Sequence, residues 1–221
     1  MNLFPEMKFE DFVDKLKVRL SMPLPGMDAQ LRMAPPKRLP TDVYLKMKDV
    51  NPKRSAVLVC FYPKQESVYT VLMQRPNEQG YHSSQVSFPG GKVEKGDVNF
   101  EQTALREAYE EVGINPAEIE VIGHLSAVYI PVSNFLVHPV VAVAPTAPDF
   151  RMNITEVQEI IETDCSVFLN PQIKSTAVFL SSGGLSVEAP SYHINRFRIW
   201  GATAMMISEL EEVTRDIFPF V

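Results

Sequence analysis

The stretch "GGKVEKGDVNFEQTALREAYEEVGI", residues 90–114, carries the clearest signal in the chain. It joins a pair of glycines to a helix that holds Glu107, Glu110 and Glu111 within five positions. Carboxylates three or four residues apart are neighbours on a helix surface, and an i,i+4 pair of like charge costs about 0.2–0.5 kcal/mol. Glu107 and Glu111 form such a pair, so we expect that another interaction or a function offsets their repulsion.

The helix in this stretch has clear ends. Asn99 is a favoured N-cap residue, and Gln102 follows three positions later, as in a capping box. Gly113 stands where a left-handed residue terminates a helix. We therefore predict a helix from about Phe100 to Val112.

We expect two opposite faces on this helix, because successive residues advance by about 100°. The acidic face holds the three glutamates. The apolar face holds the nonpolar residues Ala104, Leu105, Ala108, Tyr109 and Val112. Arg106 lies four residues before Glu110 and offsets part of the repulsion, but one arginine cannot neutralise three carboxylates.

Two interpretations of the acidic face compete. It can be a solvated surface, since charged residues are common there. It can also bind Mg²⁺ or Mn²⁺, which accept a few protein oxygens and complete their shells with water and substrate phosphate. The consecutive Gly90 and Gly91 follow a predicted strand and allow the backbone to approach a ligand closely. Loop and helix together favour the metal site.

These residues resemble the Nudix box. In that motif a glycine, five residues, a glutamate and seven residues lead to Arg-Glu-apolar-any-Glu-Glu-any-Gly-apolar. Residues 106–114, "REAYEEVGI", match at every fixed position. The first half departs, because one extra residue separates Gly91 from Arg106, and Asp97 stands in place of the upstream glutamate.

A second resemblance lies just upstream, in residues 71–91, "VLMQRPNEQGYHSSQVSFPGG". This stretch is similar to the signature of the coenzyme A pyrophosphatase branch of the Nudix family. The matching residues are Leu72, Arg75, His82, Gln85, Val86, Phe88, Pro89, Gly90 and Gly91. The departures are Met73, Pro76, Gly80 and Ser84, of which Gly80 replaces an arginine that is a candidate phosphate contact.

The resemblance implies a fold and an activity. The fold is an α/β (α+β) Nudix-like sandwich, with a mixed β-sheet between helices and an N-terminal helical extension. The activity is metal-dependent hydrolysis of a diphosphate, above all coenzyme A or an acyl-CoA, giving phosphopantetheine and adenosine 3′,5′-bisphosphate. ADP-ribose, dinucleotides and nucleoside triphosphates are alternative substrates. A non-catalytic sensor of nucleotide metabolites is the second alternative.

The resemblance also assigns roles to residues. Glu107 and Glu111 are the principal metal ligands, and Glu110 is a further ligand that pairs with Arg106. Either Glu110 or Glu111 deprotonates the attacking water, directly or through the metal. The Gly91 carbonyl is an additional candidate ligand.

Residues outside the box complete the predicted site. Glu156, in "NITEVQEII", is either another metal ligand or a carboxylate favoured by a helix N-terminus. Arg75, His82, Gly90 and Gly91 are the candidate substrate-binding residues, because an arginine fork and loop backbone groups suit phosphate. Trp200 is expected in the core, with a platform that stacks on adenine as the alternative.

The remaining sequence predicts the surrounding elements. From residue 55 onward, short apolar runs rich in β-branched and aromatic residues indicate strands. Helices are expected at 9–21, 100–112, 155–162 and 201–216. Irregular alternation of strands and helices favours a mixed-sheet fold. We predict that residues 1–50 form a helix and a proline-rich arm packed on a Nudix domain of residues 51–221.

Composition limits the partners. The net charge is −6 with a pI near 5.3 and no basic run, which argues against nucleic acid and acidic membranes. No apolar stretch reaches the length of a membrane span, and the first residues lack a signal-peptide pattern. We expect a cytoplasmic protein that binds a small-molecule diphosphate, with a homodimer left open. Cys60 and Cys165 are expected to be buried thiols.

Overall fold

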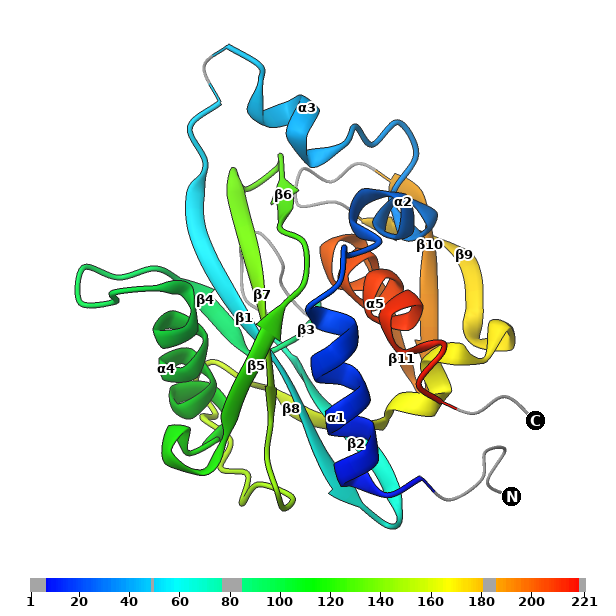
Figure 1. Cartoon of the computed structure of the whole chain (residues 1–221). Helices are drawn as coiled ribbons and strands as arrows, with labels where there is room; N and C mark the ends of the chain where they lie inside the picture. Colours follow the sequence, from blue (N-terminus) through cyan, green and yellow to red (C-terminus); the bar gives the residue numbers. More distant parts are fainter. Residues whose placement is uncertain (1–6, 49, 77–84, 181–185, 219–221) are drawn as a thin grey trace.

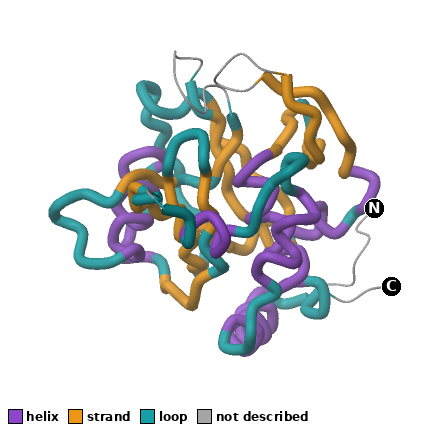
Figure 2. The backbone as a smooth tube through the Cα atoms, turned by 90° about the horizontal axis from the view of Figure 1, so that it is seen from above, coloured by secondary structure: helices purple, strands orange, loops and turns teal. Residues whose placement is uncertain are grey.

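The computed structural model describes residues 7–48, 50–76, 85–180 and 186–218. A large β-sheet crosses its middle, with helices on both sides, and a smaller sheet lies to one side (Figure 1). A second view, from above, again shows strands between helical segments (Figure 2). The predicted layered fold with a mixed sheet is therefore confirmed.

The helices are α1 (Phe9–Leu20), α2 (Gly26–Gln30), α3 (Thr41–Leu45), α4 (Phe100–Val112) and α5 (Gly201–Thr214). Short 3₁₀ helices are η1 (Leu31–Met33), η2 (Pro116–Glu118), η3 (Cys165–Leu169) and η4 (Pro171–Ile173). No helix in the described part of the chain is long and apolar enough to cross a membrane.

The strands of the large sheet are β1 (Lys53–Lys64), β2 (Ser67–Gln74), β3 (Val86–Ser87), β4 (Gly90–Lys92), β5 (Glu120–His124), β6 (Val128–Ile130), β7 (Phe135–Val143) and β8 (Glu159–Asp164). Their main order is β3-β2-β1-β7-β5, with β4 on β1, β6 on β7 and β8 on β2. Only the β1–β7 pair is parallel among the described pairings. The smaller sheet has β9 (Lys174–Leu180), β10 (Ser186–Ile194) and β11 (Phe197–Trp200).

The central strand β1 is buried on both faces, which explains its continuous apolar run. Alternate side chains point to opposite faces of a strand. Leu58 and Cys60 belong to a core on the side of α4, whereas Val59 and Phe61 belong to a core with α1 and α5. The sheet thus lies between helices, as predicted, and both cysteines are buried and free.

The caps of α4 are those that the sequence predicts. The Asn99 Oδ1 accepts a hydrogen bond from the Gln102 amide at 2.8 Å, and the Gln102 side chain accepts one from the Val98 amide at 2.9 Å. Gly113 ends the helix with φ 79° in the left-handed region. These bonds fix where the carboxylate helix begins and ends.

The predicted faces of α4 are wrong at two positions. The Glu111 side chain is buried, at 1% exposed, whereas Tyr109 is 58% exposed. The reason is helical geometry, since seven residues make about two turns and Glu111 therefore lies over Ala104, on the buried side. The helix carries a carboxylate into the protein interior.

The predicted helix at residues 155–162 is also wrong. Residues 154–156 form a turn, and β8 follows, pairing antiparallel with β2 along its whole length. The segment "EIIETD" of β8 buries Ile161 and Thr163 more deeply than their neighbours, which is the two-residue period of a strand. Pairing with β2 overrides the helical pattern.

Described residues before β1 pack on the rest of the chain. Phe12 and Leu16 of α1 are fully buried in the core that contains α5. The Gln30 side-chain nitrogen Nε2 donates a hydrogen bond to Glu209 of α5 at 2.8 Å. The Ser208 hydroxyl donates one to the Ala29 carbonyl at 2.7 Å. These contacts hold the arm on α5, and the division of the chain into an extension and a domain at residue 50 stays a prediction.

Candidate active site

The glycine loop is held against β1. Strand β4 pairs antiparallel with β1, and the Leu58 amide donates a hydrogen bond to the Pro89 carbonyl at 2.8 Å. Gly90 has φ 152°, and a Cβ there would lie 2.3 Å from the Ala56 carbonyl oxygen. A Cβ on Gly91 would lie 2.4 Å from the carboxyl carbon of Glu107. The backbone contact makes Gly90 necessary, whereas a side chain at Gly91 would displace the Glu107 carboxylate. The loop backbone therefore lies directly against a helix carboxylate.

Glu111 is the most deeply buried carboxylate of the box. Its Oε2 accepts a hydrogen bond from the Gly90 amide at 2.7 Å. The Arg75 Nη2 lies 3.5 Å from its Oε1 and donates a hydrogen bond to the Gly90 carbonyl at 2.8 Å. Burial raises the pKa of Glu111 to about 8, although Arg75 and the Gly90 amide act in the opposite direction.

Arg106 organises the acidic loop and the outer carboxylates. Its Nε and Nη2 donate to the two oxygens of Asp97, at 3.1 Å and 2.9 Å. Its Nη1 donates to Glu107 at 2.9 Å and to Glu110 at 3.2 Å. The arginine therefore ties the loop to the helix.

Asp97 keeps the arginine in place. Its Oδ2 also accepts hydrogen bonds from the Thr103 hydroxyl and the Glu94 amide, both at 2.9 Å. These bonds, and above all those from Arg106, hold the pKa of Asp97 well below its usual range. Asp97, which stands in place of the upstream box glutamate, thus supports Arg106.

The three box glutamates differ in burial. The Glu107 side chain is 13% exposed, and burial raises its pKa, with Glu110 and Glu156 adding to the shift and Arg106 opposing it. The Glu110 side chain is 49% exposed and contacts Arg106. The structure therefore brings Glu107 and Glu111 inward beside the loop and leaves Glu110 at the rim.

Glu156 approaches this group from a turn and not from a helix. The Asn153 amide donates a hydrogen bond to the Glu111 carbonyl at 2.9 Å, which anchors the turn at the end of α4. The negative charge of Glu156 contributes to the raised pKa of both Glu107 and Glu111. Its predicted place at a helix N-terminus is wrong, while its proximity to the box agrees with the predicted site. His82 lies outside the described residues.

The carboxylates fit a hard divalent cation. Glu107 lies on Gly91, and Glu111 is a buried carboxylate with one short hydrogen bond, so carboxylate oxygens are available beside a backbone loop. Within the described ranges, no group of three or more acidic, histidine or cysteine side chains lies close enough together to hold a metal ion by itself. Magnesium ions often bind through one or two carboxylates together with water and substrate phosphate, so an open donor set suits this chemistry.

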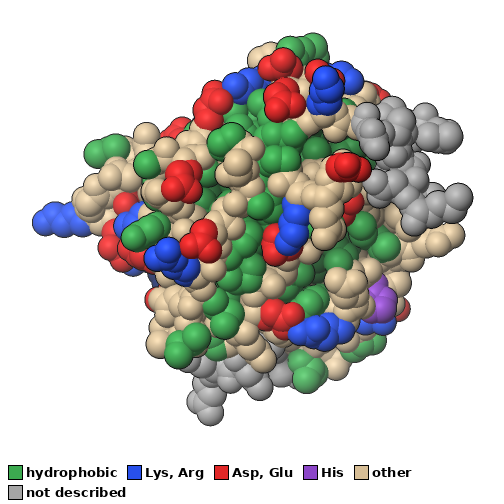
Figure 3. All heavy atoms as spheres, turned by 90° about the horizontal axis from the view of Figure 1, so that it is seen from below, with side chains coloured by type: hydrophobic (Ala, Val, Ile, Leu, Met, Phe, Trp, Pro, Cys, Tyr) green, Lys and Arg blue, Asp and Glu red, His purple; other side chains and the backbone are tan. Residues whose placement is uncertain are grey.

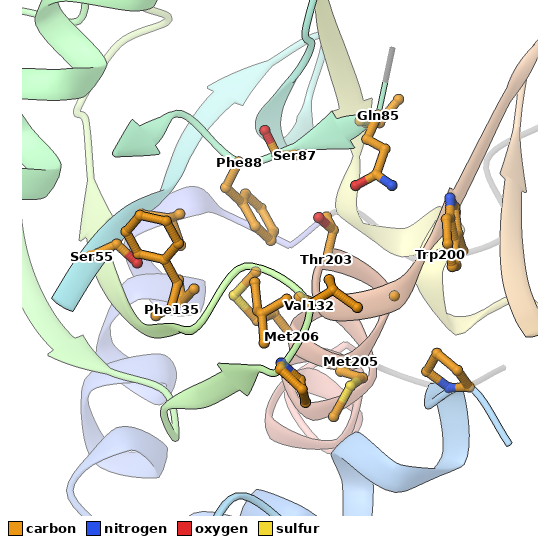
Figure 4. Close-up of a pocket in the computed structure, with 18 of the residues that line it drawn as sticks. Ser55, Gln85, Ser87, Phe88, Val132, Phe135, Trp200, Thr203, Met205 and Met206 are labelled. Atoms are coloured by element: carbon orange, nitrogen blue, oxygen red, sulfur yellow. The ribbon is translucent and has the colours of Figure 1, made fainter. Parts of the chain in front are cut away.

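A cavity of about 590 Å³ opens beside the glycine loop (Figure 4). Its lining includes Gly90 and Gly91, strands β1 and β7, and the start of α5. Figure 4 shows Ser55 and Phe135 on one side, with Gln85 and Trp200 on the other. The site therefore combines a carboxylate edge with a partly open cavity of ligand size.

Two parts of this cavity were not predicted. Trp200 is half-buried and stacks on Phe179 with ring centroids 4.4 Å apart, yet it lines the cavity in addition to packing. The arm contributes residues 35–38 and Tyr44. No local pattern reveals either contribution, because both depend on segments far apart in the sequence.

Comparison with known proteins identifies the family. The NUDIX domain family matches residues 52–167, which is more than half of the chain. This chain belongs to the Nudix family. The match contains the glycine loop, α4 and the Glu156 turn, but it ends before α5.

Curated relatives of this Nudix protein include coenzyme A diphosphatases. It is 32% identical over 143 residues to the peroxisomal coenzyme A diphosphatase NUDT7 of Mus musculus, covering 65% of this chain and 60% of that protein. It is 35% identical over 132 residues to the mitochondrial coenzyme A diphosphatase NUDT8 of Mus musculus, covering 59% and 62%. The matched part of the chain thus spans about three fifths of these relatives.

A bacterial relative matches over a longer stretch. The uncharacterised Nudix hydrolase NudL of an Enterobacter species is 32% identical over 163 residues, covering 74% of this chain and 84% of that protein. A solved MutT/nudix family protein from Enterococcus faecalis has a TM-score of 0.53 at 15% identity, covering 81% and 71%. The structural likeness supports the fold alone.

These findings confirm the predicted family and fold. The names of the two mouse relatives place one in peroxisomes and the other in mitochondria. The cytoplasmic location expected for this Nudix protein therefore stays a prediction. Figure 3 shows acidic and basic side chains interspersed on the face seen from below. The role of each site residue, the metal and the substrate are likewise still predictions.

Proposed function

We propose that this Nudix protein hydrolyses the diphosphate bond of coenzyme A or an acyl-CoA with the help of Mg²⁺ or Mn²⁺. The products are phosphopantetheine, or its acyl derivative, and adenosine 3′,5′-bisphosphate. One observation carries the proposal: Glu111 is a buried carboxylate that contacts the glycine loop of a Nudix box. The similarity to relatives named coenzyme A diphosphatases supports the choice of substrate.

The residues that would hold the divalent ion are Glu107 and Glu111, with Glu110, Glu156 and the Gly91 carbonyl as further ligands. When bound, the ion neutralises diphosphate charge and lowers the pKa of a bound water. The buried carboxylates repel one another and have raised pKa values, which a cation would relieve. This supports a cation between them over a solvated acidic face.

The chain's own groups position the substrate and move the proton. Arg75 lies beside Gly90 and Glu111, where its fork of donors can bind a phosphate oxygen of the substrate. Arg106, held by Asp97, fixes Glu107 and Glu110 on the outer side. Either Glu110 or Glu111 accepts the proton of the attacking water, Glu111 from a buried position and Glu110 from the rim.

The cavity supports a substrate with a large organic part. Its volume, about 590 Å³, lies within the range of about 300–1,000 Å³ that small-molecule sites occupy. Phe88, Phe135 and Met206 give it an apolar wall beside the glycine loop. A diphosphate at the loop could thus place its organic half in this space.

The test incubates the protein with Mg²⁺ or Mn²⁺ and a panel of diphosphates, and identifies the products by mass spectrometry. The panel holds coenzyme A, acetyl-CoA, ADP-ribose, a dinucleotide and a nucleoside triphosphate. We expect phosphopantetheine and adenosine 3′,5′-bisphosphate from coenzyme A. Turnover of ADP-ribose alone would reject the coenzyme A substrate and retain the hydrolase.

The alternative of a non-catalytic sensor predicts a different result. A sensor binds a nucleotide metabolite, measured by calorimetry, without releasing products over hours with either metal. The chain keeps all three box glutamates, and two of them approach the glycine loop. This arrangement favours catalysis over sensing.

A further inference from the structure

The charged residues that line the cavity are all cations. They are Lys37, Arg38, Arg75 and Lys92, and no aspartate or glutamate occurs among the described lining residues. The chain as a whole carries a net charge of −6, so this distribution is not a reflection of composition. A concave surface with charges of one sign concentrates ligands of the opposite sign. The cavity is therefore built for an anionic ligand.

The four cations come from two separate segments. Arg75 and Lys92 flank the glycine loop, and Arg75 is already hydrogen-bonded to Gly90. Lys37 and Arg38 come from the N-terminal arm, more than thirty positions earlier in the sequence. A diphosphate at the loop accounts for the first pair of cations and leaves the second pair unexplained.

Arg38 lacks the partner that a half-buried arginine normally has. Its Nε is buried without a hydrogen-bond acceptor, and among the described residues it forms no ion pair. Its guanidinium lies over the Tyr44 ring, 5.2 Å from the centroid. Burial lowers its pKa, but an arginine stays charged at neutral pH. Buried donors without acceptors are uncommon, so a ligand atom is a natural partner.

The order of strands indicates where Arg38 lies relative to the glycine loop. Tyr44, under Arg38, packs against Tyr129 of β6 with ring centroids 5.3 Å apart. From β6 the sheet continues through β7 and β1 to β4 of the glycine loop. Three strand intervals of about 4.8 Å give a separation of about 14 Å across the sheet. Arg38, over Tyr44, thus lies on the β6 side of the cavity, whereas Arg75 and Gly90 lie on the β4 side.

We propose that Arg38 is a specificity-determining residue that binds a phosphate monoester on the organic half of the substrate, with Lys37 beside it. The guanidinium fork matches phosphate oxygens in a bidentate arrangement. The proposal rests on the proposed function for the position of the diphosphate. If coenzyme A is the substrate, this phosphate monoester is its 3′-phosphate, which remains on the product adenosine 3′,5′-bisphosphate.

The experiment compares coenzyme A with 3′-dephospho-coenzyme A in wild-type protein and in Arg38→Met, which keeps most of the side-chain volume. We expect wild-type kcat/KM to favour coenzyme A by about tenfold or more, since a hydrogen bond to a charged group contributes about 1.5–3 kcal/mol. Arg38→Met should lower kcat/KM for coenzyme A alone and remove the preference. Arg38→Lys should restore part of it.

A matched control uses another arginine of the arm. Arg32 pairs with Glu212 of α5 and does not line the cavity. Arg32→Met removes the same charge from the same segment and should leave the preference for coenzyme A unchanged. Equal losses for both substrates in Arg38→Met, or an equal loss of preference in Arg32→Met, would overturn the proposal.

Binding measurements separate this inference from the proposed function. Calorimetry without metal compares adenosine 3′,5′-bisphosphate with adenosine 5′-monophosphate, so it requires no turnover. We expect the bisphosphate to bind about tenfold more tightly to wild type and equally to Arg38→Met. If coenzyme A is not hydrolysed but this difference is found, only the proposed function fails. Equal binding of both nucleotides to wild type rejects the role of Arg38.

Discussion

Two buried glutamates of this protein have opposite surroundings. Glu209 of α5 is fully buried, and its two oxygens accept hydrogen bonds from the Gly26 amide, the Ser126 amide and the Gln30 side chain, at 2.8–3.2 Å. Glu111 of α4 is 1% exposed and accepts one hydrogen bond, from Gly90, with Arg75 farther away. Two carboxylates that are buried to a similar degree thus accept very different numbers of hydrogen bonds.

The difference separates a structural carboxylate from a candidate catalytic one. Glu209 fastens α2 and the Ser126 loop to α5 through donors that the chain itself supplies. Glu111 retains unused acceptor capacity beside a cavity and has a raised pKa. A buried acidic group with spare acceptor capacity needs a ligand, a proton or a cation to compensate its burial. Burial alone would not have distinguished the two.

The largest expected effect is that of Glu111→Gln on catalysis. We expect kcat to fall by about 10²–10³-fold or more, because a charged group is lost where phosphate and metal charge must be stabilised. The folded protein should be as stable as wild type or more so, since the amide removes repulsion with Glu107. Steady-state kinetics and thermal unfolding measure the two quantities. An unchanged kcat would refute the assigned role.

Glu209→Gln should show the reverse pattern, with a somewhat smaller effect. The new amide nitrogen would face backbone donors, so we expect a loss of about 2–3 kcal/mol in the free energy of unfolding. The kcat of the folded protein should stay close to that of wild type. Urea unfolding and kinetics at a permissive temperature test both. A variant of normal stability would contradict the structural role of Glu209.

The smallest expected effect is a pH dependence of metal-free stability. The pKa of Glu111 rises from its ordinary value of 4.5 to about 8 on folding, so the folded protein binds the extra proton in this window. The sign follows from linkage: the stability that this proton contributes is fully present below pH 4.5 and is lost as pH rises toward 8.

The control for that experiment is Glu111→Gln in the same buffers with a chelator. The stability of this variant should not show the fall with pH that Glu111 causes in wild type. The difference in unfolding free energy between variant and wild type should therefore widen toward pH 8. Adding Mg²⁺ at pH 8 should stabilise wild type more than the variant. A constant difference across the pH range would show that Glu111 does not titrate in this way.

Local sequence patterns predicted the parts of the fold that local chemistry fixes. The caps Asn99 and Gly113 gave the limits of α4, and the continuous apolar run of β1 indicated a strand. The spacing of the box residues indicated the family. The burial of Glu111 could have been inferred from its place two turns after Ala104, and assigning the charged side chain to the solvent face concealed it.

Other features depend on contacts that no local pattern records. Strand β8 forms because β2 supplies a partner, although residues 155–162 also resemble a helix. Arg38 lines the cavity from an arm that is held on α5 by the Gln30–Glu209 hydrogen bond and on β6 by Tyr44. Sequence therefore indicated the carboxylate edge of the site, while the organic half of the cavity required the three-dimensional structure.

The anchoring of the arm on α5 also bears on how the cavity is assembled during synthesis. Residues 35–38 precede the stretch that matches the family, whereas Glu209 and the cavity-lining start of α5 follow it and are synthesised later. A nascent chain that has completed only the stretch matching the family, residues 52–167, contains the box but not the α5 wall. Selectivity for the organic half of a ligand would thus be acquired only after the box has been synthesised, once α5 and the arm come together.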